Sequence, residues 1–545
     1  MNKLSYDGPI VLAILDGVGL ALDGPGNAVA KARTSFLGGA AQRYLHVAIN
    51  ASSEYVGLMP GQMGNSEVGH NTMGSGVIRR HGAAQVEEAF SSGRIFETET
   101  WKNAIKTVLK TYKLDKNGNV CYNEKMEPAT LHFAGIFSDG GVHSDISHLM
   151  RMIMRAYQEG VRKIRVHPVF DGRDVAPRSA AIYVKRFEEF AKRFVGADIK
   201  LADGGGRMTY VADRYENDWQ MVAGGWDAMV NGEADYYFKS ASEALTMLRR
   251  IEPEIQDQYL PAFVIVDENE RPIGTVKKGD ALVYFDFRAD RAVEIAEAFC
   301  EPEFSHFKRG NYVPGQIYFA GMTEYNSDMH IPEHRLIEPI EFGETLNRFL
   351  GEKGISQLAV SETVKFGHIT YYFNGNSYEK AKKEKFVEIK SDDEPFEVRP
   401  WMKSAEITDA VISRMKDFKF IRLNYPGGDM VGHTANMKAT TIAIEAIDLS
   451  LKRLAEEVDK LGGALIIVSD HGNAEELLDA AGQPKTSHTT NKVPFIIYDN
   501  TKNRGKYKLN NLREPGLANV TATIALMLGI DDYPNKWSAP LISVL

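Results

Sequence analysis

Cysteine is scarce in this chain of 545 residues, which contains only Cys121 and Cys300. The two thiols lie far apart in the sequence and do not form the kind of disulfide framework that small secreted proteins rely on. Such sparse use of cysteine is typical of proteins from a reducing compartment. We therefore expect this protein to work in the cytoplasm.

Long apolar runs and an excess of positive charge are also missing. The first apolar run, Ile10–Leu15, has six residues, and this is too short for the core of a signal peptide or for a membrane span. The formal net charge is −9, so the chain lacks the basic character that binds nucleic acid or an anionic membrane surface. We expect neither nucleic acid nor membrane among its partners.

The composition is that of a soluble globular protein, with 43% hydrophobic and 25% charged residues. A chain of 545 residues is too long for a single ordinary hydrophobic core. We therefore expect at least two domains.

Short apolar runs recur along the chain, and each ends abruptly in a turn that carries charged or histidine residues. The seven cases are PIVLAIL before Asp16-Gly17, TLHFAGIF before SDGGVHS, KIRVHPVF before DGRD, ALVYFDF before RADR, SQLAV before SETVKFGH, KFIRLNYP before GGDMVGH, and ALIIV before SDHGN. Runs of this kind suit strands buried on both faces of a parallel sheet, and helical patterns lie between them. The alternation predicts an α/β architecture, whose ligand crevice lies beyond the carboxyl ends of the strands.

Two segments rich in turn residues suggest where the domains meet. NTMGSGVIRR covers residues 71–80 and FKRGNYVPGQ covers residues 307–316. The turns that combine carboxylates with histidines fall outside these two segments, whereas most arginine-rich turns fall between them. We therefore predict a discontinuous domain of residues 1–78 and 315–545, into which a second domain of residues 79–314 is inserted.

Six aspartates and histidines outside the insertion have the chemistry of metal ligands. They are Asp16, Asp429, His433, Asp470, His471 and His488. An Asp and a His four residues apart, as in DMVGH, share one face of a helix, although such a pair alone is more often a cap or a surface pair. Carboxylate and imidazole ligands without thiolates suit Mn²⁺, Zn²⁺, Co²⁺ or Mg²⁺. Six ligands are too many for one open catalytic ion and enough for two.

The stretch GQMGNSEVGHN, residues 61–71, places Ser66 among glycines and small polar residues. It has no apolar period, so we do not expect a packed helix or strand there. It also differs from the G-x-S-x-G turn of hydrolases, because its glycines stand at Gly64 and Gly69. One interpretation is a surface loop with a capping serine. The other is a nucleophile whose proton acceptor the stretch itself does not reveal.

Nine motifs follow one another along the chain: ILDGVG, MGNSEVGHN, SDGGVHS, DGRDVAP, FRADR, SETVKFGH, GDMVGHT, SDHGN and SHTTN. In this order they resemble the cofactor-independent phosphoglycerate mutases of the alkaline phosphatase superfamily. The resemblance implies an alkaline-phosphatase-like domain with a mainly parallel central sheet, plus an inserted α/β transferase domain. It also implies an isomerase of glycolysis and gluconeogenesis that interconverts 3-phosphoglycerate and 2-phosphoglycerate. The family does this through a phosphoserine and without 2,3-bisphosphoglycerate.

The resemblance further implies two divalent ions, with Mn²⁺ expected and Co²⁺, Mg²⁺ or Zn²⁺ as alternatives. The positions that match the family's ligands are Asp429, His433 and His488 for one ion, and Asp16, Ser66, Asp470 and His471 for the other. Ser66 is then both a metal ligand and the nucleophile. A serine hydroxyl is a weak nucleophile at neutral pH, and a divalent cation lowers its pKa and orients it for attack.

The insertion is expected to hold the substrate, a small molecule with a phosphate and a carboxylate. The guanidinium of arginine suits both groups. The positions that match the family's substrate ligands are His143, Arg173, Asp174, Arg207, Arg214, Arg288 and Arg291. Asp174 matches a general acid/base, and Lys365 matches a residue that binds the phosphoryl group and stabilises its charge during transfer. We expect the enzyme to be a monomer.

One departure from the family bears on this site. Asp203 stands before the GGG triplet, where relatives often have serine, and a carboxylate beside an anion site is unfavourable unless it points away. Other functions also stay open at this point. The metal turns alone fit a phosphatase or a phosphopentomutase of the same superfamily. A metal-bearing binding protein without turnover is a third alternative, against which Ser66, Lys365 and all six Asp and His ligands argue.

Overall fold

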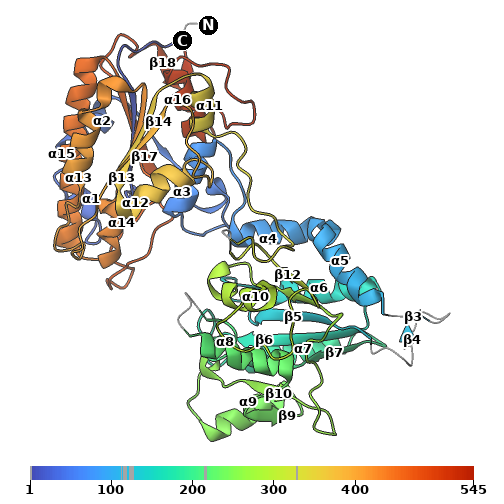
Figure 1. The fold of residues 1–545 in the computed structure, drawn as a ribbon. Coiled ribbons are helices and arrows are strands. Elements are labelled where there is room, and N and C mark those ends of the chain that lie inside the picture. Colours follow the sequence, from blue (N-terminus) through green and yellow to red (C-terminus); the bar gives the residue numbers. More distant parts are fainter. Residues whose placement is uncertain (1–2, 112, 115–119, 122–127, 214–217, 327–328) are drawn as a thin grey trace. The chain divides into compact units, whose positions relative to one another are not determined.

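The computed structural model describes residues 3–111, 113–114, 120–121, 128–213, 218–326 and 329–545. The chain forms two compact units (Figure 1). Unit 1 comprises Met1–His81 and Ile340–Leu545, and unit 2 comprises Gly82–Pro339. Among the described residues, no helix combines the length and apolar character that crossing a bilayer requires.

The second boundary differs from the predicted one, which lay between residues 314 and 315. Strand β12 (Tyr318–Gly321) pairs in parallel with β11 (Ala281–Tyr284) and so extends the sheet of unit 2. The turn-rich segment at 307–316 therefore joins two elements of unit 2, namely α10 (Val293–Cys300) and β12. The chain returns to unit 1 only after Pro339. Turn residues mark a change of direction, but they do not tell a turn within a domain from a connection between domains.

Unit 1 is built on a seven-stranded sheet that is parallel except for its last two pairings. In sheet order the strands are β14 (Glu384–Ile389), β13 (Gln357–Glu362), β15 (Phe420–Tyr425), β1 (Ile10–Leu15), β16 (Ala464–Val468), β17 (Val493–Tyr498) and β2 (Leu45–Ile49). A separate antiparallel pair is formed by β18 (Tyr507–Leu509) and β19 (Ile542–Val544). Every residue of β1, β13, β15 and β16 is buried, as predicted for strands covered on both faces.

Helices cover both faces of this sheet (Figure 1). They are α1 (Ala28–Lys31), α2 (Ser35–Arg43), α3 (Ser66–Ser75), α11 (Leu346–Glu352), α12 (Thr363–Gly367), α13 (Ser404–Ile412), α14 (Gly427–Met430), α15 (Met437–Leu461) and α16 (Ala518–Met527). Strand β1 divides its side chains between two cores. Ile10, Leu12 and Ile14 pack with α3, α11 and α16, whereas the alternate residues pack with α2, α13 and α15.

Unit 2 has a second mainly parallel sheet, in which β8 and β10 are the antiparallel pair. In sheet order the strands are β12, β11, β5 (Leu131–Ile136), β6 (Lys163–Phe170), β8 (Asp203–Gly206), β10 (Phe263–Ile265) and β9 (Tyr236–Phe238), with β7 (Asp198–Leu201) beside β6. Short strands β3 (Lys113–Leu114) and β4 (Val120–Cys121) pair with each other. The predicted α/β class, with a mainly parallel central sheet and a second α/β part, is confirmed.

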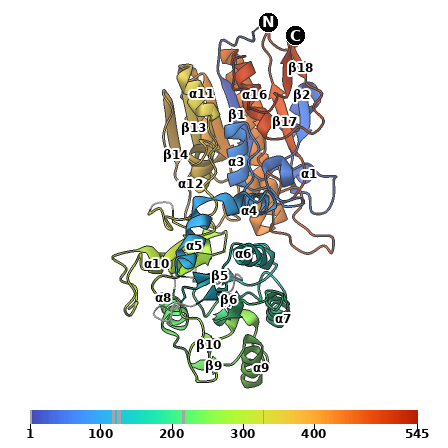
Figure 2. The ribbon, with the colours of Figure 1, turned by 90° about the vertical axis from the view of Figure 1, so that its right-hand side faces the viewer.

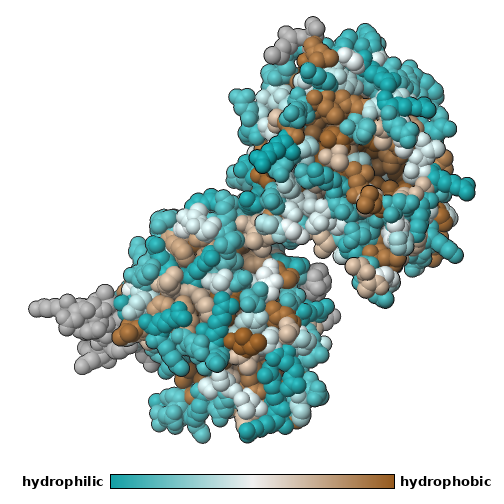
Figure 3. Space-filling view, turned by 180° about the vertical axis from the view of Figure 1, so that it is seen from behind, coloured by the Kyte–Doolittle hydropathy of each residue, from teal (hydrophilic) through white to brown (hydrophobic). Residues whose placement is uncertain are grey.

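Two groups of helices enclose the sheet of unit 2 (Figure 2). On one face lie α4 (Gly82–Ser91), α5 (Glu99–Leu109), α6 (Ile146–Gln158), α7 (Ala180–Ala191) and α9 (Ala241–Ile251), and on the other lie α8 (Trp219–Trp226) and α10. Hydrophilic residues cover most of the face of each unit seen in Figure 3, with apolar residues showing in patches. In both units the turns that carry the predicted chemistry follow the carboxyl ends of parallel strands.

Candidate active site

Ser66 is the first residue of α3 and is buried, with 4% of its surface exposed. Asn65, just before it, accepts a hydrogen bond from the Val68 amide at 3.0 Å and so caps the helix. The prediction of no packed helix here was therefore wrong, and of the two interpretations of this stretch the surface loop with a capping serine is excluded. The helix packs through glycines rather than an apolar stripe. A Cβ on Gly69 would lie 2.7 Å from the Asp470 carbonyl oxygen, and one on Gly74 would lie 1.8 Å from that of Phe373.

Three side chains from three different strand ends converge on the Ser66 hydroxyl. Lys365 Nζ donates to Ser66 Oγ at 2.6 Å, Asp16 Oδ1 accepts from it at 3.1 Å, and His471 Nε2 lies 3.0 Å away. Burial acts to lower the pKa of Lys365, but the charges of Asp16, Asp429 and Asp470 raise that pKa well above its ordinary value. Lys365 is therefore an ammonium ion aimed at the serine oxygen.

Asp429, His433 and His488 form a compact ligand group. Asp429 Oδ1 lies 3.1 Å from His433 Nε2 and 3.0 Å from His488 Nε2. The other ring nitrogens face backbone carbonyls, His433 Nδ1 at 2.6 Å from Thr486 O and His488 Nδ1 at 2.8 Å from Gly64 O. Hydrogen bonds of this kind fix the Nδ1–H tautomer, which leaves each Nε2 with a lone pair, as in metal-ligating histidines.

The two lone pairs in this group face each other, because His433 Nε2 and His488 Nε2 are 3.1 Å apart. Two unprotonated nitrogens at that distance repel unless a cation lies between them or one ring gains a proton. The group therefore fits a divalent cation held by one carboxylate and two imidazoles.

A second ligand group gathers around Asp16. Ligand atoms of Asp16, Asp429 and His471 lie within 4.8 Å of one another, and so do those of Asp16, His70 and Asp470. Burial acts to raise the pKa of Asp16, but Lys365 and His471 lower it well below its usual range. Asp470 Oδ2 is buried and has no hydrogen-bond partner among the described residues. A buried carboxyl oxygen without a hydrogen bond fits a cation as its partner.

All seven predicted metal-binding positions thus lie together in unit 1, and the structure adds residues that the sequence analysis missed. His70 Nδ1 lies 2.8 Å from Ser66 O and 3.3 Å from Asp470 Oδ2. Asn424 Nδ2 donates to Asp16 Oδ2 at 2.7 Å, and Asn473 Nδ2 donates to Asp429 Oδ1 at 3.2 Å. His70 stands four residues after Ser66, a spacing that would have indicated a shared helix face had the helix been predicted.

A separate polar cluster lies at the carboxyl edge of the unit 2 sheet, centred on Arg207. Arg207 Nη1 donates to Asp171 Oδ1 at 2.7 Å and to Asp174 Oδ2 at 2.5 Å, and its Nη2 lies 2.9 Å from His143 Nε2. Arg207 is 2% exposed. The structure therefore brings together three predicted residues, His143, Asp174 and Arg207. Asp171, which was not predicted, is the fourth member.

The remaining predicted arginines occupy different environments. Arg291 is buried, and its Nη1 donates to the Ala212 carbonyl at 2.7 Å and to the Arg207 carbonyl at 3.3 Å. It thus holds the backbone of the Arg207 turn. Arg288 is half-exposed, and its Nη2 lies 3.3 Å from Asp290 Oδ2. Arg173 donates its backbone amide to Asp171 Oδ1 at 3.2 Å. Arg214 lies outside the described residues.

Asp286, also missed by the sequence analysis, is buried beneath this cluster. Its Oδ1 accepts from the Ile136 amide at 2.8 Å. Burial raises the pKa of Asp286 to about 8, against the opposing effect of Arg207. Because a neutral Asp286 does not compete for the guanidinium, Arg207 pairs with Asp171 and Asp174.

The ligand group around Asp429 can be tested by metal binding alone. His433→Ala removes one of the three converging ligand atoms, so the affinity of the chelator-stripped protein for Mn²⁺ should fall by at least about 10- to 100-fold in isothermal titration calorimetry. His46→Ala changes an exposed histidine of β2 in the same unit and should leave the affinity unaltered. Equal affinities for the two variants would contradict the assignment of His433 as a ligand.

Comparison with known proteins gives one consistent answer. The model of the Metalloenzyme superfamily matches residues 8–532. The chain is 44% identical to a probable 2,3-bisphosphoglycerate-independent phosphoglycerate mutase of Leptospira interrogans, over 96% of this chain and 95% of the relative. It is 40% identical to the 2,3-bisphosphoglycerate-independent phosphoglycerate mutase of Trypanosoma brucei brucei, over 98% and 97% of the two chains.

A solved structure agrees with these relatives. The crystal structure of Leishmania mexicana phosphoglycerate mutase at low cobalt concentration matches with a TM-score of 0.67 and 36% identity, over 100% of this chain and 99% of that one. The chain therefore belongs to the Metalloenzyme superfamily and, within it, to the family of 2,3-bisphosphoglycerate-independent phosphoglycerate mutases.

Proposed function

We propose that this protein is a monomeric cytoplasmic isomerase that interconverts 3-phosphoglycerate and 2-phosphoglycerate through a phosphoserine at Ser66. The observation that carries the proposal is the convergence of Lys365, Asp16 and His471 on one buried serine hydroxyl. The activity for which the relatives are named supports the choice of substrate. The reaction needs no added 2,3-bisphosphoglycerate, because the substrate itself supplies the phosphoryl group.

Two divalent ions, Mn²⁺ by expectation, complete the serine site in this proposal. One is held by Asp429, His433 and His488, and the other by Asp16, Ser66, Asp470 and His471. When bound, such ions lower the pKa of the serine hydroxyl and neutralise the charge of the phosphoryl group. The two ligand groups, together with the buried Asp470 Oδ2 that lacks a hydrogen-bond partner among the described residues, support this arrangement.

Lys365 has a role of its own in the transfer. Its Nζ lies 2.6 Å from Ser66 Oγ, and it also contacts Asp429 Oδ2 at 2.7 Å. A buried ammonium at this distance stabilises the negative charge that develops on the serine oxygen and on the phosphoryl group. Its contacts with Asp16 and Asp429 keep it both charged and fixed in place.

The cluster around Arg207 holds the glycerate in this proposal. Arg207 and His143 supply donors for the substrate carboxylate and hydroxyl oxygens. Asp174, joined to Arg207 at 2.5 Å, is the general acid/base. It protonates the oxygen that loses the phosphoryl group and takes the proton from the oxygen that regains it. A mutase differs from a phosphatase of the same superfamily in that this glycerate stays bound while the phosphoryl group resides on Ser66.

Retention of the glycerate gives a direct test of the proposed function. The Mn²⁺-loaded protein should convert 3-phosphoglycerate to 2-phosphoglycerate with no 2,3-bisphosphoglycerate present. Labelled free glycerate added to the reaction should stay out of the product, because the phosphoryl group returns to the same molecule. A requirement for the bisphosphate, or rapid incorporation of the label, would contradict the proposal. Release of inorganic phosphate as the main product would instead indicate a phosphatase.

The separate roles proposed for the serine site and for the Arg207 cluster predict a change in product ratio. Arg288→Ala removes a half-exposed cation at the substrate cluster, and the loss of one charge-assisted contact costs about 1.5–3 kcal/mol, or roughly ten- to a hundred-fold in binding or rate. Isomerisation should slow accordingly. A larger share of turnovers should end in attack of water on the phosphoserine, which raises the ratio of inorganic phosphate to 2-phosphoglycerate.

Two variants control this measurement. Arg250→Ala changes an exposed arginine of α9 in the same unit and should alter neither rate nor ratio. Ser66→Ala should abolish both isomerisation and phosphate release, because it removes the acceptor oxygen. A constant product ratio in Arg288→Ala, despite a lower rate, would show that the arginine does not protect the intermediate from water.

A further inference from the structure

A chain of buried polar side chains crosses the sheet of unit 2 away from the Arg207 cluster. Asp280 Oδ2 lies 3.1 Å from His132 Nε2, His132 Nδ1 lies 2.8 Å from His167 Nε2, and His167 Nδ1 lies 2.6 Å from Asp203 Oδ2. The Tyr210 hydroxyl donates to the second oxygen of Asp203 at 2.6 Å. None of these five residues is more than 4% exposed. We refer to them as the buried chain.

Counting protons shows that the buried chain holds one proton more than two neutral imidazoles supply. Its three contacts between Asp280, His132, His167 and Asp203 each need one proton, whereas two neutral imidazoles carry only two. The third proton must therefore reside on an imidazole or on a carboxyl group. Leaving one of these buried acceptor pairs without a proton would place two lone pairs face to face.

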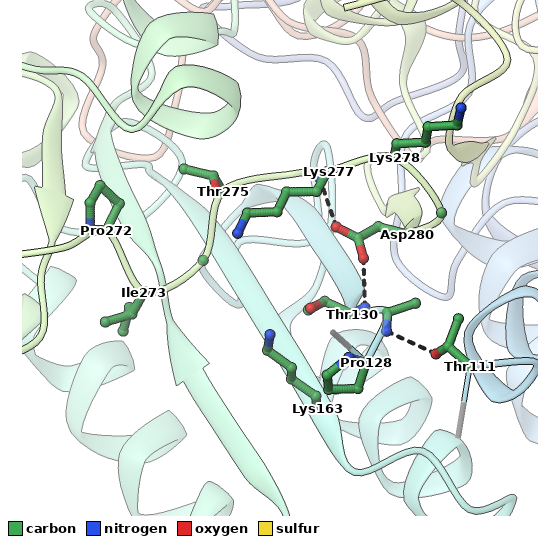
Figure 4. A pocket seen from close by; sticks show the side chains of 13 residues that line it. Thr111, Pro128, Thr130, Lys163, Pro272, Ile273, Thr275, Lys277, Lys278 and Asp280 are labelled. Carbon is green, nitrogen blue, oxygen red and sulfur yellow. Dashed lines mark hydrogen bonds between the residues drawn. The ribbon is translucent and has the colours of Figure 1, made fainter. Parts of the chain in front are cut away.

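The surroundings of Asp280 use both of its carboxyl oxygens as hydrogen-bond acceptors. Its Oδ1 accepts from the Thr130 amide at 2.7 Å and its Oδ2 from the Lys277 amide at 2.7 Å (Figure 4). Both oxygens are thus used as acceptors, so the proton of the contact with His132 belongs to His132 Nε2. Asp280 also lines a pocket of about 390 Å³ at the amino ends of β5, β6 and β11.

The extra proton lies where His167 meets Asp203, at the end of the buried chain opposite Asp280. Burial lowers the pKa of His132 to about 4, even though Asp280 opposes the shift. A neutral His132 with its proton on Nε2 accepts at Nδ1, so His167 Nε2 donates to it. Burial and the charge of Asp203 raise the pKa of Tyr210 well above its ordinary value, so Tyr210 also remains a donor. The remaining proton lies in the contact between His167 Nδ1 and Asp203, which at 2.6 Å is short, as charge-assisted hydrogen bonds are.

Asp203 is also the only residue with a side chain in its strand. Strand β8 consists of Asp203 followed by Gly204, Gly205 and Gly206, and Arg207 comes next. The glycines permit close packing, since a Cβ on Gly206 would lie 2.4 Å from the backbone carbonyl of Gln258. A strand without other side chains has no means but backbone pairing and Asp203 to fix its position.

We propose that Asp203 is a positioning residue, whose ion pair with a protonated His167 anchors β8 and thereby sets the position of Arg207 in the substrate cluster. The carboxylate points away from that cluster, and its charge is balanced by the imidazolium inside the buried chain. Asp203 can therefore precede the three glycines and the anion-binding Arg207 without repelling the anion. The inference depends on the proposed function only for the identity of what Arg207 binds.

The protonation of His167 can be measured without any assay of activity. In ¹⁵N-histidine NMR at pH 8, more than one unit above the ordinary histidine pKa of about 6.5, both ring nitrogens of His167 should carry protons. In Asp203→Asn the amide can donate to His167 Nδ1, so every hydrogen bond is kept and His167 should become neutral. An unprotonated ring nitrogen on His167 in the parent protein at pH 8 would overturn the ion pair.

The positioning role has a kinetic readout. Asp203→Ala removes the anchor, so the KM for 3-phosphoglycerate should rise by about tenfold or more, with a smaller change in kcat. Asp203→Asn replaces the ion pair by a neutral hydrogen bond to His167, so KM should rise by a smaller factor of about threefold. Asp267→Ala, at an exposed site in the same unit, should leave both parameters unchanged.

The outcomes separate the inference from the proposed function. An unchanged KM in Asp203→Ala would overturn the positioning role. If that variant does not fold, the asparagine variant decides, since an unchanged KM in a variant that lacks the ion pair would overturn the positioning role. Absence of isomerisation in the parent protein would reject the proposed function instead, and the protonation of His167 would still be measurable.

Discussion

Repulsion among three buried carboxylates is the constraint on which the serine site depends. Asp16 lies within 4.8 Å of ligand atoms from both Asp429 and Asp470, and two like charges about 4 Å apart repel by about 4 kcal/mol at an effective dielectric constant of 20. Lys365 supplies one positive charge against three negative ones. Burial acts to lower the pKa of His471, but the same carboxylates raise that pKa to about 9, so the folded chain draws further positive charge to this point. The facing lone pairs of His433 and His488 do the same. Ser66 lies beside these carboxylates, at the place where the compensating cations are expected.

The two units balance their buried carboxylates in different ways. Each collects charged side chains at the carboxyl edge of a mainly parallel sheet, where strand ends converge. In unit 2 the chain itself supplies the balancing cation at this edge, with Arg207 between Asp171 and Asp174. In unit 1 it supplies too few, which leaves room for metal ions. This contrast matches chemistry that activates a hydroxyl in one unit and holds an organic anion in the other.

Much of this arrangement could be predicted from the sequence because strand ends have a simple signature. A continuous apolar run followed by Asp16, or by the Asp470-His471 pair, indicates both a buried strand and the edge to which its ligands belong. Helix α3 could not be recognised in the same way, because only Val68 and Met73 of its buried residues are large and apolar, and its close contacts are made at Gly69 and Gly74. His70 was missed as a consequence. The domain boundary after Pro339 depends on the pairing of β12 with β11, a long-range contact that no local pattern records.

The substrate cluster was predicted less completely, because an arginine's role depends on what its side chain meets. Arg207 and Arg291 look alike in sequence, yet one faces carboxylates and the other binds backbone carbonyls. Asp203 illustrates the opposite case. A residue that seemed unfavourable by its position turns out to point into the interior, toward His167 and Tyr210. Such directions follow from tertiary packing and not from the residue type.

The central claim is that the phosphoryl group resides on Ser66 during turnover, and rapid acid quenching tests it most directly. The Mn²⁺-loaded protein is mixed with 3-phosphoglycerate labelled in its phosphate, quenched within one turnover, and mapped by peptide mass spectrometry. The account predicts label on the peptide that contains Ser66, appearing and decaying at rates compatible with turnover. Isomerisation that proceeds with no labelled serine, or with the label on a different residue, would contradict it.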